Sequence, residues 1–539
     1  MRERDELIIA DLIATRAERD PGLDVLTFEH LGLDGGATPD EVRTYSDLAT
    51  NGNRIAAELV ARGMQRGDRF GIMMRNHPEF VETIIAASTT GAIFVPIDPR
   101  TRGEKLAFML RRSGCRGLVI ADYCLAELDR VRDEVPGLEW VLGLETGETA
   151  DAVSLDSLHG IDSLKAVLAT SAPTVGVRLE SADDPLQIMF TSGTTGDPKG
   201  AIAGNDRFTR AGMLGALFDY RPDERPYTGL SLTHTNAQAI TLAPTLVLGL
   251  RGVFSRRFTK SRFWDVCRRS GCTQISLVGG MVAGLYGEPP RPDDADNPVR
   301  LVVSGGMPAA IWEAFAERFN VQILEFYGAN DGGGMAYNPP GVGPVGSIGK
   351  PMPGVEMKIL DDAGAVCEPG VVGEICCRPE GGGVASVEYV GDAAASAAKI
   401  RDGWNRSGDM GHADADGWLY FDYRRGGGIR HNGDFVHPGY VEKALAEHPD
   451  VSDVFVYGVE SASGTPGEKD VVAALVLREG SDPEPESLFA WCRERLESNF
   501  VPEYLQVVDE IPKTASEKPQ ERFLAERFAP DQVWTPARH

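Results

Sequence analysis

Apolar residues follow two alternating patterns over the first part of the chain. Residues 44–65 carry them at the spacing of three and four that is typical of a helix, with Ser46 placed as an N-terminal cap. Continuous apolar runs at residues 67–74 and 91–98 predict short buried strands, and the helix-like run 78–89 separates them. Because helices and strands alternate, the pattern predicts an α/β fold with a mostly parallel sheet.

Later segments predict further subdomains. The alternation recurs at residues 116–143 and 186–330, whereas residues 145–184 are polar and are expected to form surface loops. Residues 341–424 have the strand–turn–strand pattern of antiparallel hairpins or a small β-barrel. Beyond them, Gly426–Gly428 form a natural hinge before a helix, two strands and a second helix.

This order predicts two domains. The 539-residue chain can bury a large core without the help of disulfides or metals. We expect residues 1–424 to form a large N-terminal domain of layered α/β subdomains with a small β-barrel-like subdomain. Residues 425–539 should form a smaller, mobile α+β C-terminal domain.

Composition narrows the classes of function. The chain has 54 Lys and Arg against 80 Asp and Glu, a net charge of −26, which argues against nucleic acid or an anionic membrane as the main partner. Its eight cysteines show no CxxC spacing, so neither a zinc site nor a disulfide framework is indicated, and a reducing cytoplasm is the expected location. The most apolar stretch, residues 240–250, contains Pro244 and is too short to span a membrane.

A loop rich in serine, threonine and glycine is the sharpest motif in the chain. Thr191–Gly200, with the sequence TSGTTGDPKG, follows a strand-like run at residues 186–190. Its glycines free the backbone to bend around an anion, its hydroxyls donate hydrogen bonds, and Lys199 supplies positive charge. It differs from the GxxxxGK[ST] loop, because Pro198 stands where the second glycine would be. The segment predicts a phosphate-binding loop.

This loop resembles the signature loop of the acyl-adenylate-forming superfamily, which includes acyl- and aryl-CoA ligases, peptide-synthetase adenylation domains and firefly-type luciferases. The resemblance covers nearly the whole chain, from about Thr44 to Arg522, and is closest in style to carnitine-type and medium/long-chain or polycyclic acid CoA ligases. It implies a ligase that uses ATP, Mg²⁺ and coenzyme A to convert a carboxylic acid to acyl-CoA, AMP and diphosphate through an acyl-adenylate. The loop residues that the resemblance assigns to nucleotide binding are Thr191, Ser192, Gly193, Thr194, Thr195, Gly196 and Lys199.

A second motif, Phe326–Asp331, resembles the family's Tyr-Gly-x-Thr-Glu. Tyr327 and Gly328 match, and the resemblance implies that the tyrosine stacks on adenine. Asn330 replaces the threonine that binds the α-phosphate, and its amide can still donate a hydrogen bond. Asp331 replaces the glutamate that holds Mg²⁺, with the same charge and one methylene less.

The resemblance assigns the ribose contacts to a third motif. Asp409 matches the aspartate that binds both ribose hydroxyls, and a carboxylate suits such a diol. Arg424 matches an arginine that contacts ribose and phosphate, and Phe421 matches a position packed on adenine. Gly433 is retained from the turn that helps to line the family's pantetheine tunnel.

The catalytic roles implied by the resemblance fall on Lys518, His234 and Asn330. Lys518 ends a segment similar to the family's Pro-Lys-Thr-x-x-Gly-Lys and would bridge the acyl carboxylate and the ATP phosphate. In this segment Glu517 replaces the usual glycine and Pro519 the usual isoleucine. The residues that the resemblance places in the substrate pocket are His234, Thr235, Asn236, Gly305, Gly306, Phe326, Gly332 and Gly333.

The expected partners are small molecules. Because Gly332–Gly334 lack side chains at pocket-lining positions, we predict a bulky acid, although the run Asn236–Gln238 is most similar to carnitine-type ligases. Arg256, Arg257 and Lys260 form a basic cluster that either receives the phosphates of coenzyme A or is a solvated charge run. The sequence is compatible with a homodimer.

Three alternatives remain open at this level. The changed metal-ligand motif and the Glu517–Pro519 segment fit an enzyme that mainly thioesterifies a preformed acyl-adenylate. A second alternative hands the acyl group to an amine or a carrier-protein thiol instead of coenzyme A. A non-catalytic binding module is the third, and the presence of Lys199, Asp409 and Lys518 argues against it.

Overall fold

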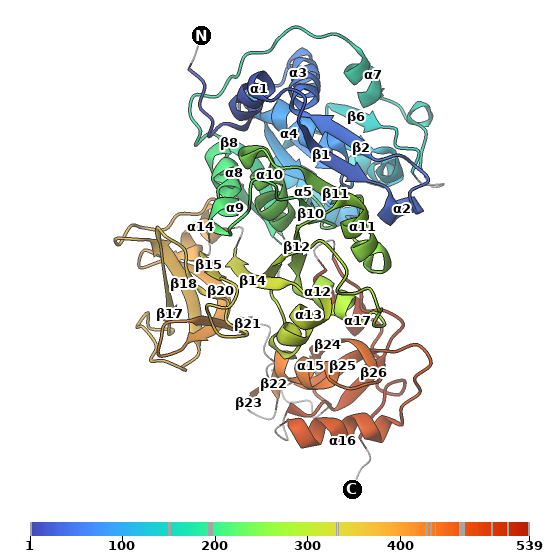
Figure 1. Cartoon of the computed structure of the whole chain (residues 1–539), viewed down its shortest axis with the longest axis vertical. Helices are drawn as coiled ribbons and strands as arrows, with labels where there is room; N and C mark the ends of the chain where they lie inside the picture. Colours follow the sequence, from blue (N-terminus) through green and yellow to red (C-terminus); the bar gives the residue numbers. More distant parts are fainter. Residues whose placement is uncertain are drawn as a thin grey trace. The chain divides into compact units, whose positions relative to one another are not determined.

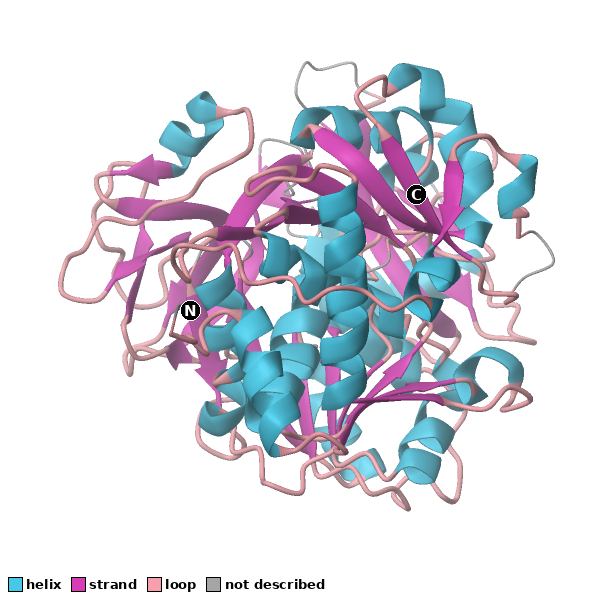
Figure 2. Cartoon of the chain, turned by 90° about the horizontal axis from the view of Figure 1, so that it is seen from above, coloured by secondary structure: helices cyan, strands magenta, loops and turns pink. Residues whose placement is uncertain are grey.

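Helices and strands alternate along the first half of the chain, as the apolar pattern predicts (Figure 1). Figure 2 shows the helices in cyan and the strands in magenta. The computed structural model describes residues 3–536 except 149–151, 192–197, 330, 333, 426–428, 432–433, 437, 463–468, 497–499 and 515–516. Two units share the chain: the first holds Met1–Leu277, Asp296–Val303 and Val387–Ala398, and the second holds Val278–Ala295, Ser304–Ser386 and Lys399–His539. The expected domain boundary between residues 424 and 425 falls inside the second unit and stays a prediction.

A seven-stranded sheet carries the first unit, in the order β7-β6-β5-β3-β4-β8-β9. Its neighbouring strands are parallel except for the antiparallel pair of β8 with β9, which confirms the predicted mostly parallel sheet. The strands are β3 (Arg69–Met73), β4 (Ile93–Pro96), β5 (Cys115–Ala121), β6 (Trp140–Leu144), β7 (Ile161–Ser163), β8 (Pro185–Thr191) and β9 (Lys199–Gly204).

A second set of strands in this unit runs β12-β10-β11-β1-β2, parallel except where β1 meets β2. These strands are β1 (Asp24–Glu29), β2 (Glu41–Thr44), β10 (Pro226–Thr228), β11 (Gly252–Ser255) and β12 (Gln274–Val278). The helices of this part of the chain are α1 (Ile9–Arg19), α2 (Leu31–Asp34), α3 (Tyr45–Ala61), α4 (Pro78–Thr90), α5 (Gly103–Ser113), α6 (Leu125–Val131), α7 (Leu164–Ala169), α8 (Asn205–Gly212), α9 (Leu214–Leu217), α10 (Ala243–Leu248) and α11 (Phe263–Ser270).

Two local predictions were wrong. Helix α3 begins one residue before Ser46, and Thr44 is its cap: the Thr44 side chain accepts from the Asp47 N–H while the Asp47 side chain accepts from the Thr44 N–H. This reciprocal capping box satisfies two free N–H groups at once, which a serine inside the first turn cannot do. The polar stretch 145–184 is also more than loop, since it contributes β7 and α7.

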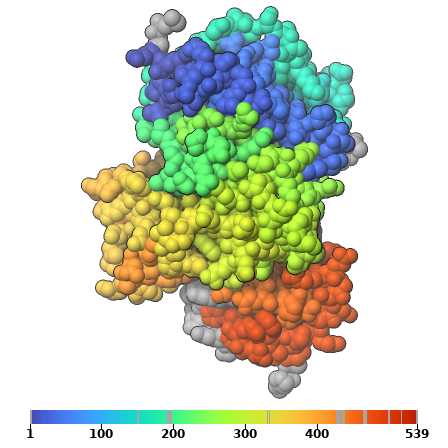
Figure 3. Space-filling model, viewed as in Figure 1, coloured from blue at the N-terminus to red at the C-terminus, as the bar shows by residue number. Residues whose placement is uncertain are grey.

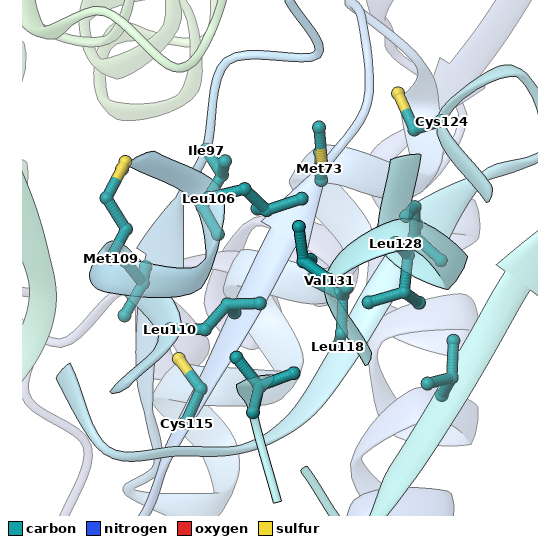
Figure 4. Packing of buried hydrophobic residues seen from close by; sticks show 14 of the residues in the cluster. Met73, Ile97, Leu106, Met109, Leu110, Cys115, Leu118, Cys124, Leu128 and Val131 are labelled. Carbon is teal, nitrogen blue, oxygen red and sulfur yellow. The ribbon is translucent and has the colours of Figure 1, made fainter. Parts of the chain in front are cut away.

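The core of the first unit packs beneath α5 and α6 (Figure 4). Leu106 and Leu110 of α5 and Leu128 of α6 meet Leu118 of β5, and all are fully or almost fully buried. Full burial of such a side chain stabilises the fold by roughly 1.5–3 kcal/mol relative to exposure. The helices therefore hold the parallel sheet whose edge carries the predicted phosphate loop.

The second unit is richer in antiparallel structure. Strand β14 (Gln322–Gly328) pairs with β15 (Met335–Asn338), which pairs with β16 (Lys350–Pro351). A five-stranded antiparallel sheet follows, as the hairpin pattern after residue 341 predicts; Figure 3 shows its residues in yellow to orange. Its strands are β17 (Val355–Leu360), β18 (Gly373–Pro379), β19 (Ile400–Arg401), β20 (Trp404–Ala413) and β21 (Leu419–Arg424). Strand β13 (Leu301–Gly305) runs across the boundary of the two units.

The C-terminal part of the second unit is an α+β arrangement. The hairpin β22 (Ile429–His431) with β23 (Asp434–Val436) precedes a three-stranded sheet of β24 (Val451–Glu460), β25 (Lys469–Leu477) and β26 (Tyr504–Val507). The α-helices that belong to this part are α15 (Pro438–Ala446), α16 (Pro485–Arg495) and α17 (Glu521–Ala525). Elsewhere in the second unit lie α12 (Gly279–Tyr286) and α13 (Trp312–Phe319), whereas α14 (Ala393–Lys399) belongs to the first unit except for Lys399. Among the residues described, no helix combines the length and apolar character needed to cross a membrane.

Candidate active site

The predicted phosphate loop connects two antiparallel strands. Strand β8 ends at Thr191, β9 begins at Lys199, and these two residues are partners in the register. Lys199 is exposed, and its amino group lies 5.5 Å from the ring centre of Tyr389. The hairpin thus brings both ends of the loop to the edge of the sheet. The other predicted contacts of this loop lie outside the described residues: Ser192, Gly193, Thr194, Thr195 and Gly196.

Strands β20 and β21 place a carboxylate opposite a guanidinium. Asp409 and Arg424 are cross-strand partners, so their spacing in the sequence follows from the register of the hairpin. Arg424 Nη1 lies 3.2 Å from Asp409 Oδ1, with the aspartate buried and the arginine exposed. Each carboxylate oxygen has two lone pairs, so Asp409 keeps the capacity to accept hydrogen bonds from a diol.

Tyr327 reaches the same carboxylate from β14. Its hydroxyl donates to Asp409 Oδ2 at 2.7 Å, and Gly328 ends the strand next to it. Burial, followed by the charge of Asp409, raises the pKa of Tyr327 well above its ordinary value, so the phenol stays a neutral donor. On β21 the side chain of Phe421 is 45% exposed, which makes an aromatic surface available for stacking.

The predicted catalytic lysine forms two hydrogen bonds with Thr514, four residues before it. The Thr514 N–H donates to the Lys518 carbonyl at 2.8 Å, and the Lys518 N–H donates to Thr514 Oγ1 at 3.1 Å. Although Lys518 keeps an exposed surface, burial of its amino group lowers its pKa, the Arg424 guanidinium lowers it further, and the Asp409 carboxylate opposes both. The lysine therefore shares one electrostatic environment with the β20–β21 pair.

A buried glutamate that the sequence analysis missed holds the predicted pocket wall. Glu325 Oε1 accepts from the Gly306 N–H at 2.5 Å, and Oε2 accepts from the Met307 N–H at 3.0 Å. These N–H groups directly follow Gly305, the last residue of β13. Burial raises the pKa of Glu325 to about 8. Its place two residues before Tyr327 is the only signal in the sequence, and that signal has no distinctive spacing.

His234, Thr235 and Asn236 are half-buried residues of the first unit. The Asn236 N–H donates to His234 Nδ1 at 3.2 Å, whereas Thr235 Oγ1 and Asn236 Oδ1 are buried and have no hydrogen-bond partner among the described residues. A π-helix, Ala237–Leu242, follows directly. Such segments are rare in proteins overall, and many of those known lie at functional sites. Because buried polar atoms normally have hydrogen-bond partners, these two unpaired oxygens are suited to bind a polar group of a ligand.

The carboxylate predicted to hold Mg²⁺ is paired with a lysine. Lys399 Nζ lies 2.7 Å from Asp331 Oδ2, and Asp331 is 8% exposed. Mg²⁺ requires oxygen ligands at about 2.1 Å in near-octahedral geometry, and a carboxylate already bound to an ammonium group does not fit a resident ion. Nothing in the local pattern around Lys399 could have pointed to this pairing. Asn330, the predicted α-phosphate contact, lies outside the described residues.

The glycines after Asp331 have a structural explanation. Gly332 and Gly334 have φ values of 74° and 93°, a region that favours glycine. A Cβ on Gly334 would also lie 2.8 Å from Cys377 Cβ on β18. Their missing side chains therefore do not by themselves indicate room for a bulky acid. Gly333 and Gly433 lie outside the described residues, and Phe326 is half-buried on β14.

One cation assigned to coenzyme A is engaged elsewhere. Arg256 is only 4% exposed; its Nε donates to Glu148 Oε1 at 2.5 Å and its Nη1 donates to the Asn76 carbonyl at 2.6 Å. A third contact joins its Nη2 to Glu41. The suggestion that Arg256 receives the phosphates of coenzyme A was therefore wrong, because the guanidinium is buried and neutralised within the first unit.

Two family models match the chain. Residues 13–386 match the AMP-binding enzyme family, and residues 440–518 match the AMP-binding enzyme C-terminal domain. The first match contains the phosphate loop and the Tyr327 motif, and the second ends at Lys518. The order of the two matches therefore agrees with the order of the motifs along the sequence.

Known proteins of this type resemble the chain over most of its length. The medium/long-chain-fatty-acid–CoA ligase FadD17 of Mycobacterium tuberculosis is 31% identical over 504 residues, covering 92% of this chain and 94% of that protein. The crotonobetaine/carnitine–CoA ligase of Salmonella choleraesuis is 28% identical over 481 residues, covering 88% and 91%. The solved structure of the anthranilate CoA ligase AuaEII in complex with anthranoyl-AMP shares the fold, with a TM-score of 0.81 at 23% identity and 96% coverage of both chains.

Proposed function

This chain belongs to the AMP-binding enzyme family, and on that premise we propose that it is an ATP-dependent carboxylic acid–CoA ligase. The observation that supports the proposal is the convergence of Tyr327 and Arg424 on the Asp409 carboxylate, with Lys518 in the same electrostatic environment. A ribonucleotide offers a diol, an aromatic base and anionic phosphates, and these residues offer the matching acceptor, ring and cations. ATP and coenzyme A are the co-substrates.

In the first proposed half-reaction, a carboxylate oxygen of the acid attacks the α-phosphorus of ATP. The bond from this phosphorus to the oxygen that bridges to the β-phosphate breaks, so that diphosphate leaves and an acyl-adenylate remains. Lys518 is the residue proposed to neutralise the charge that develops between the carboxylate and the phosphate. Asp409 and Tyr327 would hold the nucleoside in place, and such positioning supplies much of the rate. Mg²⁺ enters as part of the substrate Mg·ATP.

In the second proposed half-reaction, the sulfur of coenzyme A attacks the acyl carbon and AMP leaves. The thiol proton is lost, and the thioester product forms. A rotation of the small C-terminal domain between the two steps would let one site serve both. The separate family match for residues 440–518 supports the assignment of this part as a distinct domain.

We propose that the acid substrate either has a chain of medium or greater length or is bulky. The support is the similarity to a ligase named for medium- and long-chain fatty acids. The unpaired polar atoms of Thr235 and Asn236 favour an acid that also carries a polar group. A screen of acids of graded size and polarity, with acyl-CoA formation as the readout, tests this; a preference for acetate or propionate would contradict it.

Replacement of Lys518 by alanine tests the central role in the proposal. We expect ATP–diphosphate exchange to fall by about a hundredfold or more, because a charge-stabilising group is lost. Lys513→Ala is the matched control: this lysine belongs to the same segment, but its amino group pairs with Asp453 Oδ2 at 2.5 Å, and exchange should persist. Undiminished exchange in Lys518→Ala would refute the assigned role.

The second candidate function is that of an enzyme that mainly catalyses the thioesterification half-reaction. Glu517 and Pro519 in the lysine segment, together with the Asp331–Lys399 pair, favour an enzyme that adenylates slowly and thioesterifies a supplied acyl-adenylate well. Comparison of diphosphate exchange with turnover of added acyl-AMP distinguishes the two. Equal rates would favour the complete ligase, and much faster turnover of acyl-AMP would favour the second candidate function. Replacement of coenzyme A by amines or carrier proteins tests the remaining acceptor alternative.

We also propose that the protein works in a reducing compartment such as the cytoplasm. All eight cysteines are free thiols, and every one except Cys367 is buried. Free thiols persist where glutathione and thioredoxin keep them reduced. Fractionation of cells that express the protein, followed by immunodetection, tests the location.

A further inference from the structure

A buried ion pair occupies the place where the family motif carries its metal ligand. Lys399 Nζ lies 2.7 Å from Asp331 Oδ2, and the two side chains are 13% and 10% exposed. The same ammonium group donates to the Ser407 carbonyl at 3.2 Å. The lysine is therefore held by a carboxylate and a backbone oxygen at once, which satisfies two of its three donors.

The backbone that presents Asp331 is itself anchored. Asn405 Nδ2 donates to the Asp331 carbonyl at 2.7 Å, and Cys377 Sγ donates to the Gly332 carbonyl at 2.9 Å. Asn405 belongs to β20 and Cys377 to β18, so two strands of the antiparallel sheet fix this turn. The aspartate side chain is one methylene shorter than that of glutamate. Because its backbone is fixed, the carboxylate cannot extend beyond the lysine as a glutamate could.

The ion pair is connected to the predicted ribose contact. Ser407, whose carbonyl accepts from Lys399, has a side-chain oxygen that accepts from the Asp409 N–H at 2.9 Å. Lys399 thus links the turn at Asp331 to the start of the β20–β21 pair. Its charge stands beside the residues proposed to hold the nucleotide, and a buried cation there is screened far less than one in water.

A divalent ion at Asp331 would have to displace this ammonium. The lysine would then remain largely buried without its counter-ion, which is strongly unfavourable. The competition therefore favours the lysine over a free metal ion.

We propose that Lys399 takes the place of the metal at Asp331, as a positioning residue that supplies a permanent positive charge beside the nucleotide. In consequence, the free protein has no tight divalent-metal site at Asp331, and Mg²⁺ enters only on the phosphates of Mg·ATP. This inference rests on the proposed function for its role in catalysis, while its statement about metal binding concerns the chain alone.

Titration of the full-length protein with Mn²⁺ in the absence of nucleotide, followed by electron paramagnetic resonance, tests the inference. We expect the wild-type protein and Asp331→Asn to give the same weak titration. Lys399→Met should gain one site that is at least tenfold tighter and that disappears in the double variant Lys399→Met/Asp331→Asn. Lys399→Arg should behave like the wild type, because it restores a cation.

Two results would overturn the inference. The first is a tight Mn²⁺ site in the wild-type protein that Asp331→Asn abolishes; this comparison decides the question even if Lys399→Met fails to fold. The second is a folded Lys399→Met protein that gains no site. Lys358→Met, at an exposed lysine on β17, is the matched control and should leave the titration unchanged. Binding of ATP, measured separately by calorimetry, distinguishes failure of this inference from failure of the proposed function.

Discussion

Glu517 holds a conformation that suits the glycine it replaces. Its φ of 58° is left-handed, a region that costs a residue with a Cβ roughly 1–2 kcal/mol. The same residue places a carboxylate next to Lys518, the cation proposed to meet the ATP phosphate. Backbone strain and charge thus both oppose the proposed chemistry at this one position.

Glu517→Gly is therefore expected to accelerate ATP–diphosphate exchange by a fewfold to tenfold. Relief of the left-handed strain exceeds the extra entropy that glycine loses on folding, which is about 0.4–1 kcal/mol, so stability should stay equal or rise slightly. Glu517→Gln is the matched control, since it removes the charge and keeps the Cβ. If glycine gave no faster exchange than glutamine, backbone strain would have no part in the effect.

Glu325 makes stability depend on pH with a defined sign. Burial raises its pKa from 4.5 to about 8, so the folded protein holds a proton on this side chain that the unfolded chain has already lost in the interval between those values. The folded state binds more protons there, and its stability must fall as pH rises. The contribution of protonated Glu325 to the free energy of unfolding is fully present below about pH 4.5 and is lost as pH rises through about 8.

Glu325→Gln should flatten this dependence. Between about pH 5 and about pH 8, we expect the free energy of unfolding of the wild type to fall by about 1.4 kcal/mol per pH unit more than that of the variant. Urea unfolding at steps across this interval measures the difference between the two proteins. The buried Glu79 and Glu442, whose pKa values burial raises to about 7, contribute equally to both and cancel. Parallel curves would contradict the prediction.

At the scale of elements, the segment that carries Glu517 and Lys518 packs closely against the start of helix α12. A Cβ built on Gly280 would lie 2.7 Å from the Glu517 carbonyl oxygen and 3.0 Å from the Glu517 Cβ. The backbone of the segment therefore approaches the helix as closely as only glycine permits. On the same helix, Gly284 faces open space at the corresponding position.

Gly280→Ala should slow adenylation by about tenfold or more, because the lysine segment must shift away from its docked position. Turnover of supplied acyl-AMP should change much less, since the proposed role of Lys518 belongs to the first half-reaction. Gly284→Ala gains the same helix propensity of about 1 kcal/mol without a clash and should leave both rates unchanged. Equal effects of the two substitutions on exchange would disprove the docking role.

Some elements were predictable from local patterns and others were not. The antiparallel hairpins after residue 341 carry their turn signals between strand-like runs, so the prediction for that region was confirmed. The prediction of loop for the segment 145–184 was wrong because β7 has only three residues and α7 only six, too few to show a strand or helix period. The prediction of Ser46 as the cap was wrong because a cap depends on which N–H groups are free, and Thr44 with Asp47 satisfies them from two residues earlier.

At the scale of the whole molecule, limited proteolysis tests the predicted boundary between the two domains. The three glycines Gly426–Gly428 are flanked by Arg424, Arg425 and Arg430, which are trypsin sites. We expect limited trypsin digestion to cut first at this boundary, and a non-hydrolysable acyl-adenylate analogue to slow the cut by holding the two parts together. Mass spectrometry of the fragments checks both points; first cuts elsewhere, with this segment intact, would contradict the boundary.

The order of elements, the phosphate-loop composition and the family resemblance were all available from the sequence, because each depends on neighbouring residues along the chain. The partners of the charged groups were not. Lys399 meets Asp331, Glu325 holds Gly306, and Arg256 is buried, through contacts between segments far apart in the sequence. Only folding brings such groups together and removes them from water, and burial then decides whether a charge is available for a ligand or already neutralised.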